Sequence, residues 1–413
     1  MPIIRSLLDL DQYKPTMAQV VWRRFGDIPV TYGFKNRTAE TNLADYIIQE
    51  ELEEELNLIR SLRFSVQDRW YLRHSWQINQ IKPGLFSRDF IASLEGLELP
   101  PVEVHKENGT YAIEVSGLWP RAIWWETMVL AVLNELYCRS ALQRTGVWTP
   151  TAWKEGERRL LEKVALLKAN PDITFVEFGT RRRFSAEWQR RVLEVLLEEI
   201  PNQVLGTSNV ALAREFNIKP IGTFAHEMFM VLYGHACAGN KKNPVLTAHR
   251  AVCEAWWKEY GETLSISLTD TFGTDFFLEN FTAAQAHVWR GLRQDSGDPI
   301  EIGEKIIAFY EKHKIDPREK LILFSDGLSI EKIIELTNHF KGRIKIAFGW
   351  GTNLTNDVGL APLSLVMKAT EASGHGTLKL SDNPAKATGT PEDIERVMQE
   401  VGYKKRPAQP VVY

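Results

Sequence analysis

The stretch ITFVEFGTRRRFSAEW, from Ile173 to Trp188, sets a pattern that recurs along the rest of the chain. A short apolar run ends at Phe178 and is followed by a polar turn that begins with Gly179. An apolar run of this length, bounded by a glycine turn, is typical of a buried strand. After Ser185 the apolar side chains recur on one helical face. The stretch therefore predicts one strand–turn–helix unit.

Six more units of this kind follow, and their apolar runs are residues 203–205, 220–221, 264–268, 288–292, 321–324 and 343–348. Strands in succession, most of them with helices between, predict a parallel sheet, and the number of units favours a closed α/β barrel. In such barrels the active site lies at the carboxyl ends of the strands. All seven polar turns lie at that end, so we expect their side chains to meet on one rim.

The first hundred residues follow a different, irregular pattern. The run Val30–Phe34 predicts a strand, and Leu43–Leu62 predicts a long helix with an acidic outer face. Ser65 and Asp68 have the spacing of a capping box at the start of another helix. Two alternating runs around Asn108-Gly109 predict a β-hairpin. This part is expected to form a separate α+β domain.

Composition narrows the class of protein. The 413 residues suggest two domains, and 44% hydrophobic with 25% charged residues is ordinary for a globular protein. The net charge of −3, without a broad basic face, argues against nucleic-acid binding. The most apolar helix, roughly 122–142, is interrupted by charged residues and predicts a buried helix, not a membrane span. No signal peptide is expected. The cysteines, Cys138, Cys237 and Cys253, fit no metal or redox motif and predict reduced, buried thiols in a cytoplasmic protein.

Three turns carry residues suited to a phosphorylated sugar. The turn from Arg293 to Asp298 offers a cation and two carboxylates, which can bind ribose hydroxyls or Mg²⁺ together with substrate phosphates. We expect Asp298 only to cap the helix that Pro299 begins, whereas Asp295 is the functional candidate. Asp326 has the same chemistry, although an aspartate before glycine is equally common in plain turns.

The last clear strand is followed by Gly349-Trp-Gly351-Thr352, whose backbone N–H groups and hydroxyl could cradle a phosphate. His226, in the turn GTFAHE, could act as base, acid, metal ligand or nucleophile, while a lone histidine is more often structural. Phe178 could stack on an aromatic ring or belong to the core. One of the three arginines 181–183 could meet an anionic substrate, and the others are expected to be structural.

With these motifs assembled, the chain resembles the nicotinate phosphoribosyltransferase family almost from end to end. The matching segments, in the family's order, are Leu10-Asp-Gln-Tyr13-Lys-Pro-Thr-Met17, Phe178-Gly-Thr-Arg-Arg182, Gly206-Thr-Ser-Asn209, Gly222-Thr-Phe-Ala-His226-Glu227, Arg293-Gln-Asp295-Ser-Gly-Asp298, Ser325-Asp326, Phe348-Gly-Trp-Gly-Thr352 and Lys379-Leu-Ser-Asp-Asn-Pro-Ala-Lys386. Each motif is modest alone, but six or more in register are specific.

The resemblance implies a fold and its domains. It implies an irregular parallel α/β barrel of the type II phosphoribosyltransferase kind over residues 117–360. It implies an N-terminal α+β domain over residues 1–116, to which the C-terminal segment 361–413 returns. It also implies a homodimer in which Tyr13 of one subunit closes over a ring held by Phe178 of the other.

The resemblance also implies the reaction of NAD salvage in which nicotinate and phosphoribosyl pyrophosphate give nicotinate mononucleotide and pyrophosphate, coupled to ATP hydrolysis. By the same resemblance, ATP phosphorylates His226, Arg293 and Thr223 bind the nicotinate region, and Arg181 places substrate. Asp295 and Asp326 are implied to bind ribose and, through water, Mg²⁺. The phosphate site is assigned to Gly349, Gly351 and Thr352.

Three other readings stay open. The first is a related phosphoribosyltransferase specific for nicotinamide or quinolinate. The second is a phosphosugar aldolase or isomerase, which would need a Schiff-base lysine or paired acid and base at the strand ends. The third is a non-catalytic nucleotide sensor, for which loss of His226 or Asp295 would be expected, yet both are present.

Overall fold

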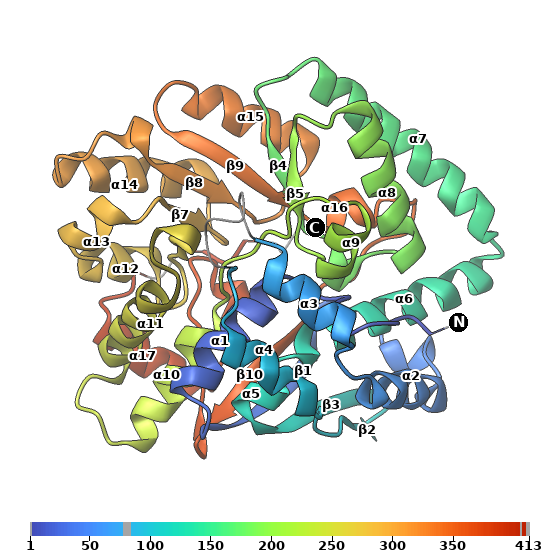
Figure 1. Ribbon diagram of the computed structural model, residues 1–413, viewed down its shortest axis with the longest axis horizontal. Coiled ribbons are helices and arrows are strands. Elements are labelled where there is room, and N and C mark those ends of the chain that lie inside the picture. The colour runs from blue at the N-terminus through green and yellow to red at the C-terminus, as the bar shows by residue number, and fades with distance from the viewer. Residues whose placement is uncertain (1, 77–83, 405–406, 410–413) are drawn as a thin grey trace. The chain divides into compact units, whose positions relative to one another are not determined.

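The computed structural model describes residues 2–76, 84–404 and 407–409 and is mixed α/β (Figure 1). Its helices are α1 (Tyr13–Arg24), α2 (Gln49–Ser61), α3 (Val66–His74), α4 (Arg88–Ser93), α5 (Trp119–Ala122), α6 (Trp125–Thr145), α7 (Thr149–Lys168), α8 (Ala186–Glu199), α9 (Val210–Glu215), α10 (Glu227–Ala238), α11 (Pro244–Tyr260), α12 (Thr274–Asn280), α13 (Ala283–Val288), α14 (Pro299–Lys312), α15 (Ile330–Phe340), α16 (Thr352–Thr355) and α17 (Pro391–Glu400). Its strands are β1 (Pro29–Asn36), β2 (Glu103–Glu107), β3 (Thr110–Leu118), β4 (Phe175–Glu177), β5 (Val204–Thr207), β6 (Ile266–Leu268), β7 (Gly291–Gln294), β8 (Leu321–Phe324), β9 (Lys345–Trp350), β10 (Leu365–Ala372) and β11 (His375–Gly376).

The strands form two sheets. One has six strands in the order β5-β4-β9-β8-β7-β6, and its β4–β5, β6–β7, β7–β8 and β8–β9 pairs are parallel. The other has five strands in the order β11-β10-β1-β3-β2, with β2–β3 and β10–β11 antiparallel. The predicted fold class, an irregular parallel α/β barrel with an N-terminal α+β part, is confirmed as mixed α/β with a parallel six-stranded sheet. In the described residues β5 and β6 stand at opposite ends of the strand order, so the pairings do not close these strands into the expected ring. The predicted domain limits at residues 116 and 360 stay a prediction.

The parallel sheet is less regular than its sequence pattern. Six of the seven predicted strands are present, but the expected strand at 220–221 is wrong, because Pro220 makes only one parallel bridge, to Thr207. Proline has no N–H to donate to a ladder. The run predicted at 288–292 is also displaced, since α13 ends at Val288 and β7 begins at Gly291.

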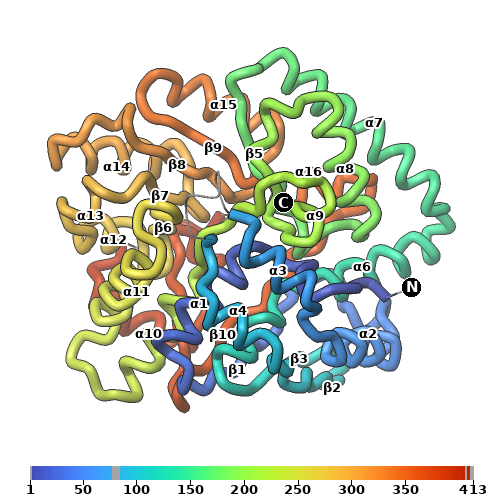
Figure 2. Tube along the Cα trace, viewed as in Figure 1, coloured from blue at the N-terminus to red at the C-terminus, as the bar shows by residue number. Residues whose placement is uncertain are grey.

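By its internal contacts the chain divides into two compact units. Unit 1 comprises residues 1–27, 31–222 and 350–368, and unit 2 comprises residues 28–30, 223–349 and 369–413. In unit 1, α6 is buried along most of its length, as predicted, and the hairpin β2–β3 turns at Asn108-Gly109, both with positive φ. In unit 2, α14 and α15 lie side by side (Figure 1), as do α10 and α11 (Figure 2).

Local helix signals are mostly confirmed. Ser65 and Asp68 form the predicted capping box of α3, and Asp298 caps α14 as predicted. Ser185 and Ser329 cap α8 and α15. The side chain of Asn209 caps α9.

The predicted continuous helix 43–62 is also wrong. A 3₁₀ turn at Leu43–Asp45 is separated from α2, because the Ile47 carbonyl between them accepts a hydrogen bond from the Tyr111 hydroxyl. Within the described residues, no helix is long and apolar enough to cross a bilayer.

Candidate functional site

Five of the predicted site residues gather into two clusters, one in each unit, together with side chains that the sequence did not single out. The ring cluster of unit 1 is formed by Tyr13, Phe178, Arg181 and Glu126. The histidine cluster of unit 2 is formed by His226, Asp270, Asp295 and Lys379.

In the ring cluster, Tyr13 begins α1 and Phe178 follows β4. Their rings lie parallel, 5° apart, with centroids separated by 6.2 Å. Arg181 Cζ lies 5.8 Å from the centroid of the Tyr13 ring. The resemblance implied that Tyr13 reaches Phe178 from another subunit. In the structure, α1 and the segment after β4 bring both rings together within one chain, and the arrangement across two subunits stays a prediction.

Glu126, on α6, lies among three cationic side chains beside the two rings of the ring cluster. Its carboxylate accepts from Lys14 at 2.8 Å and from the Tyr13 hydroxyl at 3.3 Å, and Lys368 and Arg181 lie at 3.4 and 3.8 Å. Burial would raise the pKa of Glu126, but Lys14, Lys368 and Arg181 outweigh burial and hold that pKa well below its usual value. Glu126 is therefore ionised, and it orients the cations beside the two rings.

The three consecutive arginines have different surroundings. Arg183 is buried and bonds both oxygens of Asp9, at 2.6 and 2.8 Å. Arg182 donates twice to the Leu365 carbonyl. Arg181 stays about a third exposed and faces Asp11, at 3.5 Å. Burial raises the pKa of Asp11, an effect that Arg181 opposes. Arg181 is thus the arginine of the three that remains suited to meet a substrate.

The predicted phosphate turn crosses the boundary between the units. Gly351 and Thr352 belong to unit 1, where a Cβ on Gly351 would lie 2.9 Å from the Phe178 carbonyl oxygen, so only glycine allows this approach. The Phe178 N–H donates to the Trp350 carbonyl at 2.8 Å, and Thr352 begins α16 and is buried. Gly349 belongs to unit 2, where it lies against Ser325.

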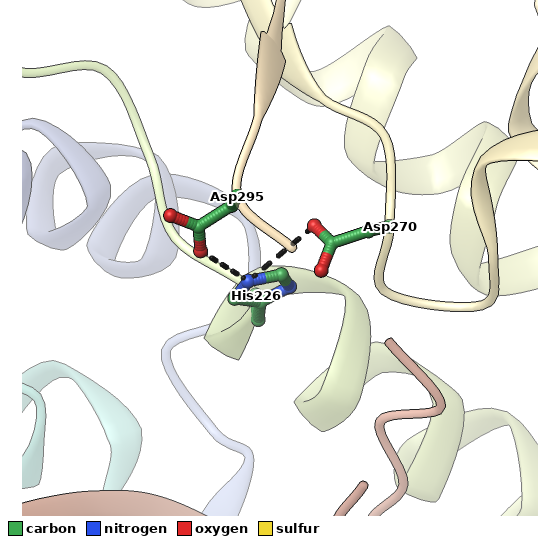
Figure 3. Close-up of side chains that lie close together, drawn as sticks. All are labelled: His226, Asp270 and Asp295. Atoms are coloured by element: carbon green, nitrogen blue, oxygen red, sulfur yellow. Dashed lines mark hydrogen bonds and ion pairs between the residues drawn. The ribbon is translucent and has the colours of Figure 1, made fainter. Parts of the chain in front are cut away.

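In the histidine cluster, His226 directly precedes α10 and is buried (Figure 3). Its Nε2 lies 2.8 Å from Oδ2 of Asp295, which follows β7, and 3.6 Å from Oδ1 of Asp270, which follows β6. Its Nδ1 lies 2.9 Å from the Thr271 hydroxyl. Figure 3 shows the two carboxylates reaching the imidazole from separate loops.

Lys379, in the C-terminal segment, completes this cluster. Its Nζ lies 2.9 Å from His226 Nε2 and 3.4 Å from Asp270 Oδ2. Burial, and after it Lys379, lowers the pKa of His226 to about 4, so the imidazole is neutral at pH 7. Burial would raise the pKa of Asp295, but Arg293 and His226 hold it well below the usual value. A buried neutral imidazole beside ionised groups can act as a nucleophile.

The atoms of His226, Asp270 and Asp295 that could bind a metal ion lie within 4.8 Å of one another. Lys379, however, already lies against two of these three residues. Its ammonium supplies the positive charge that a cation bound between them would bring. This donor set therefore does not fit a directly bound metal. That Mg²⁺ meets the protein through water and substrate phosphates stays a prediction.

The remaining predicted residues of unit 2 surround this cluster. Arg293 donates to the Phe224 carbonyl at 3.2 Å, and its NH2 lies 3.9 Å from Asp295. Asp326 is ion-paired with Lys386, and burial outweighs that lysine and raises the pKa of Asp326. Ser325 links the strand ends by donating to Asp295 Oδ1 at 2.8 Å. Thr223 lies half-buried in the segment before His226.

Sequence reasoning missed three members of these clusters, Glu126, Asp270 and Lys379, and the neighbouring Lys14. Asp270 follows a strand as Asp295 and Asp326 do, and that position could have identified it. Lys14 and Lys379 stand in motifs that matched the family but suggested no role. Glu126 was treated only as an interruption of an apolar helix.

Comparison with known proteins agrees with the fold and with the motifs. The model of the "Nicotinate phosphoribosyltransferase (NAPRTase) family" matches residues 173–405, and that of its N-terminal domain matches residues 8–134. A nicotinate phosphoribosyltransferase structure from Vibrio cholerae is 35% identical, with a TM-score of 0.87, covering 98% of this chain and 95% of its own. One from Porphyromonas gingivalis is 33% identical, with a TM-score of 0.86 and coverage of 97% and 100%. A putative one from Saccharomyces cerevisiae is 30% identical, with a TM-score of 0.84 and coverage of 98% and 99%.

Proposed function

The chain belongs to the nicotinate phosphoribosyltransferase family, and we propose that it forms nicotinate mononucleotide and pyrophosphate from nicotinate and phosphoribosyl pyrophosphate, coupled to ATP hydrolysis through a phosphohistidine at His226. The observation that carries the ATP-coupled part is the buried, neutral imidazole of His226, held by Thr271, Asp295 and Lys379.

The transfer itself is a displacement at the anomeric carbon. The ring nitrogen of nicotinate forms the new C–N bond with its own lone pair, and the C–O bond to pyrophosphate breaks. The sugar becomes cationic in the transition state, and the ionised carboxylate of Asp295 suits the stabilisation of that charge. Mg²⁺ carried by the substrate's phosphates, near Asp295 and Asp326 through water, would neutralise the departing pyrophosphate. No strong general base is needed.

The ring cluster suits the aromatic acid. Parallel Tyr13 and Phe178 rings can contact a pyridine ring, and Arg181 can face its carboxylate. The resemblance also assigns nicotinate binding to Arg293 and Thr223. The resemblance assigns the 5′-phosphate to Gly349, Gly351 and Thr352.

ATP enters through a separate phosphoryl transfer. A nitrogen of His226 attacks the γ-phosphorus, an N–P bond forms, and the bond to the β–γ bridging oxygen breaks, with its electrons leaving on ADP. The phosphohistidine would tighten substrate binding, and its hydrolysis would release product. A coupling free energy of about 1–3 kcal/mol corresponds to roughly 5- to 150-fold in affinity.

The same resemblance leads us to propose a homodimer working in NAD salvage in the cytoplasm. The three cysteines are unpaired thiols, which suits a reducing compartment.

Phosphoribosyl transfer measured with and without ATP, in wild type and in His226→Ala, tests the proposal. We expect the variant to keep some transfer and to lose its stimulation by ATP. An unchanged response to ATP in His226→Ala would reject the phosphohistidine. Parallel assays with nicotinamide and quinolinate test the substrate, because turnover faster with either one would reject nicotinate.

A further inference from the structure

Two carboxylates lie close to the imidazole of His226, and this poses a chemical difficulty for a nucleophile. Asp295 at 2.8 Å and Asp270 at 3.6 Å from Nε2 would together favour the protonated, cationic form. An imidazolium has no lone pair and cannot attack phosphorus. Burial of the imidazole opposes the two carboxylates, and a positive charge in the cluster would add to that effect.

The ammonium of Lys379 contacts the same nitrogen of His226, Nε2. It is a donor only, so its 2.9 Å contact with Nε2 is favourable only when that nitrogen carries a lone pair. Neutral imidazole then carries its hydrogen on Nδ1, where the Thr271 hydroxyl can accept it at 2.9 Å. Lys379 and Asp295 thus compete for Nε2, because the first requires a lone pair there and the second requires a proton.

The backbone holds Lys379 in this place. Its N–H and carbonyl both pair with Thr388, and the two residues that follow it donate their N–H groups to the carbonyls of Thr271 and Asp270, at 2.7 and 3.1 Å. The C-terminal segment therefore runs along the loop that carries Asp270, and the lysine stem enters the cluster already buried.

We propose that Lys379 is a positioning residue that adds to the effect of burial in keeping His226 neutral and nucleophilic, by placing one positive charge against the imidazole where two carboxylates favour its protonation. The inference rests on the proposed role of His226 as the phosphoryl acceptor. The charged groups recorded around the imidazole are Lys379, Asp270 and Asp295, with Arg293 beyond Asp295. Burial and then Lys379 are the main causes of the lowered pKa of His226.

The test is a pH titration of His226 by NMR on the full chain with ¹⁵N-labelled histidine, with the signal assigned by its loss in His226→Gln. We expect a wild-type midpoint well below pH 6.5 and, in Lys379→Met, a midpoint at least one unit higher, a tenfold gain in proton affinity. Lys379→Gln, which keeps an N–H donor without the charge, should shift in the same direction.

Lys320→Met is the matched control, because Lys320 is also buried in unit 2 but donates to the carbonyls of His287 and Trp289. Its midpoint should equal that of wild type. A wild-type midpoint at or above pH 6.5, or midpoints in both Lys379 variants equal to wild type, would overturn the inference.

A second readout links the titration to phosphorylation. We expect phosphohistidine formation from ATP in Lys379→Met to be at least twofold slower at pH 5 than at pH 7.5, because a midpoint of about 5 or higher leaves half or more of the imidazole protonated at pH 5. A merely structural defect would not be rescued by raising the pH. Rates equally low at both values would overturn the inference. Absence of phosphohistidine from the wild type, by ³¹P NMR, would instead reject the proposed function. The titration needs no ATP, so the two failures are distinguishable.

Discussion

The ring of Tyr13 lies parallel to the ring of Phe178, and the Tyr13 hydroxyl donates to Glu126 at 3.3 Å. One side chain thus combines an aromatic face with a hydrogen bond to the buried carboxylate that orients Lys14 and Arg181. The ring and the hydroxyl can be tested separately.

Tyr13→Ala should raise the KM for nicotinate by at least tenfold, since an aromatic pair contributes about 0.5–1.5 kcal/mol beyond the area it buries. Tyr13→Phe keeps the ring and loses only the hydroxyl bond, so its KM should rise less than threefold. Steady-state kinetics at saturating phosphoribosyl pyrophosphate measure both. Equal KM values for the two variants would contradict a stacking role.

Asp270→Asn should destabilise the fold by about 3–5 kcal/mol. The substitution removes the carboxylate that forms an ion pair with Lys379, and the buried ammonium of Lys379 remains without it. Adding Lys379→Met should recover part of that loss. Urea unfolding of the two single variants and the double variant measures the coupling. Additive changes in the free energy of unfolding would mean that the two side chains do not interact.

His249 makes stability depend on pH. It is buried against Phe229 and Phe277, and burial lowers its pKa to about 4. Between pH 6.5 and 4 the unfolded chain binds this proton more readily, so stability falls as the pH falls through that window. The loss from this residue is about 2 kcal/mol at pH 5 and about 3 kcal/mol in full.

His249→Phe should remove that part of the pH dependence. Urea unfolding of wild type and variant at pH 7 and pH 5 gives the comparison. On going from pH 7 to pH 5, the difference in free energy of unfolding between the two proteins should change by about 2 kcal/mol in favour of the variant. His226 contributes a similar pH dependence of stability to both proteins, so its effect cancels in this comparison. Parallel stability curves would show that His249 is already accessible to protons in the folded state.

Gly179→Ala should lower stability by more than 1 kcal/mol, because a Cβ there would lie 1.9 Å from the Thr355 hydroxyl oxygen. Thermal unfolding tests this prediction. Gly96→Ala is a suitable control, since a Cβ at that position meets nothing within 4 Å. A melting temperature equal to wild type in Gly179→Ala would mean that Thr355 moves aside freely.

Much of the fold could be predicted because it depends on neighbours in sequence. The capping box at Ser65, the hairpin at Asn108-Gly109 and the helix starts at Asp298 and Ser329 involve hydrogen bonds within a few residues. One failed prediction has a distant cause: in the helix predicted from Leu43, the Ile47 carbonyl accepts a hydrogen bond from Tyr111 of the hairpin. The strand expected at 220–221 failed for a local reason, because Pro220 has no N–H to donate.

The sequence by itself determined the alternation of strands and helices, the strand-end positions of Asp295 and Asp326, and the family motifs, since each is encoded by periodicity or by adjacent residues. Only the tertiary structure decided that Arg183 is buried against Asp9 and that Lys379 meets His226. An ion pair between distant residues depends on which buried charges the fold places within a few ångströms of each other, and no local pattern carries that information.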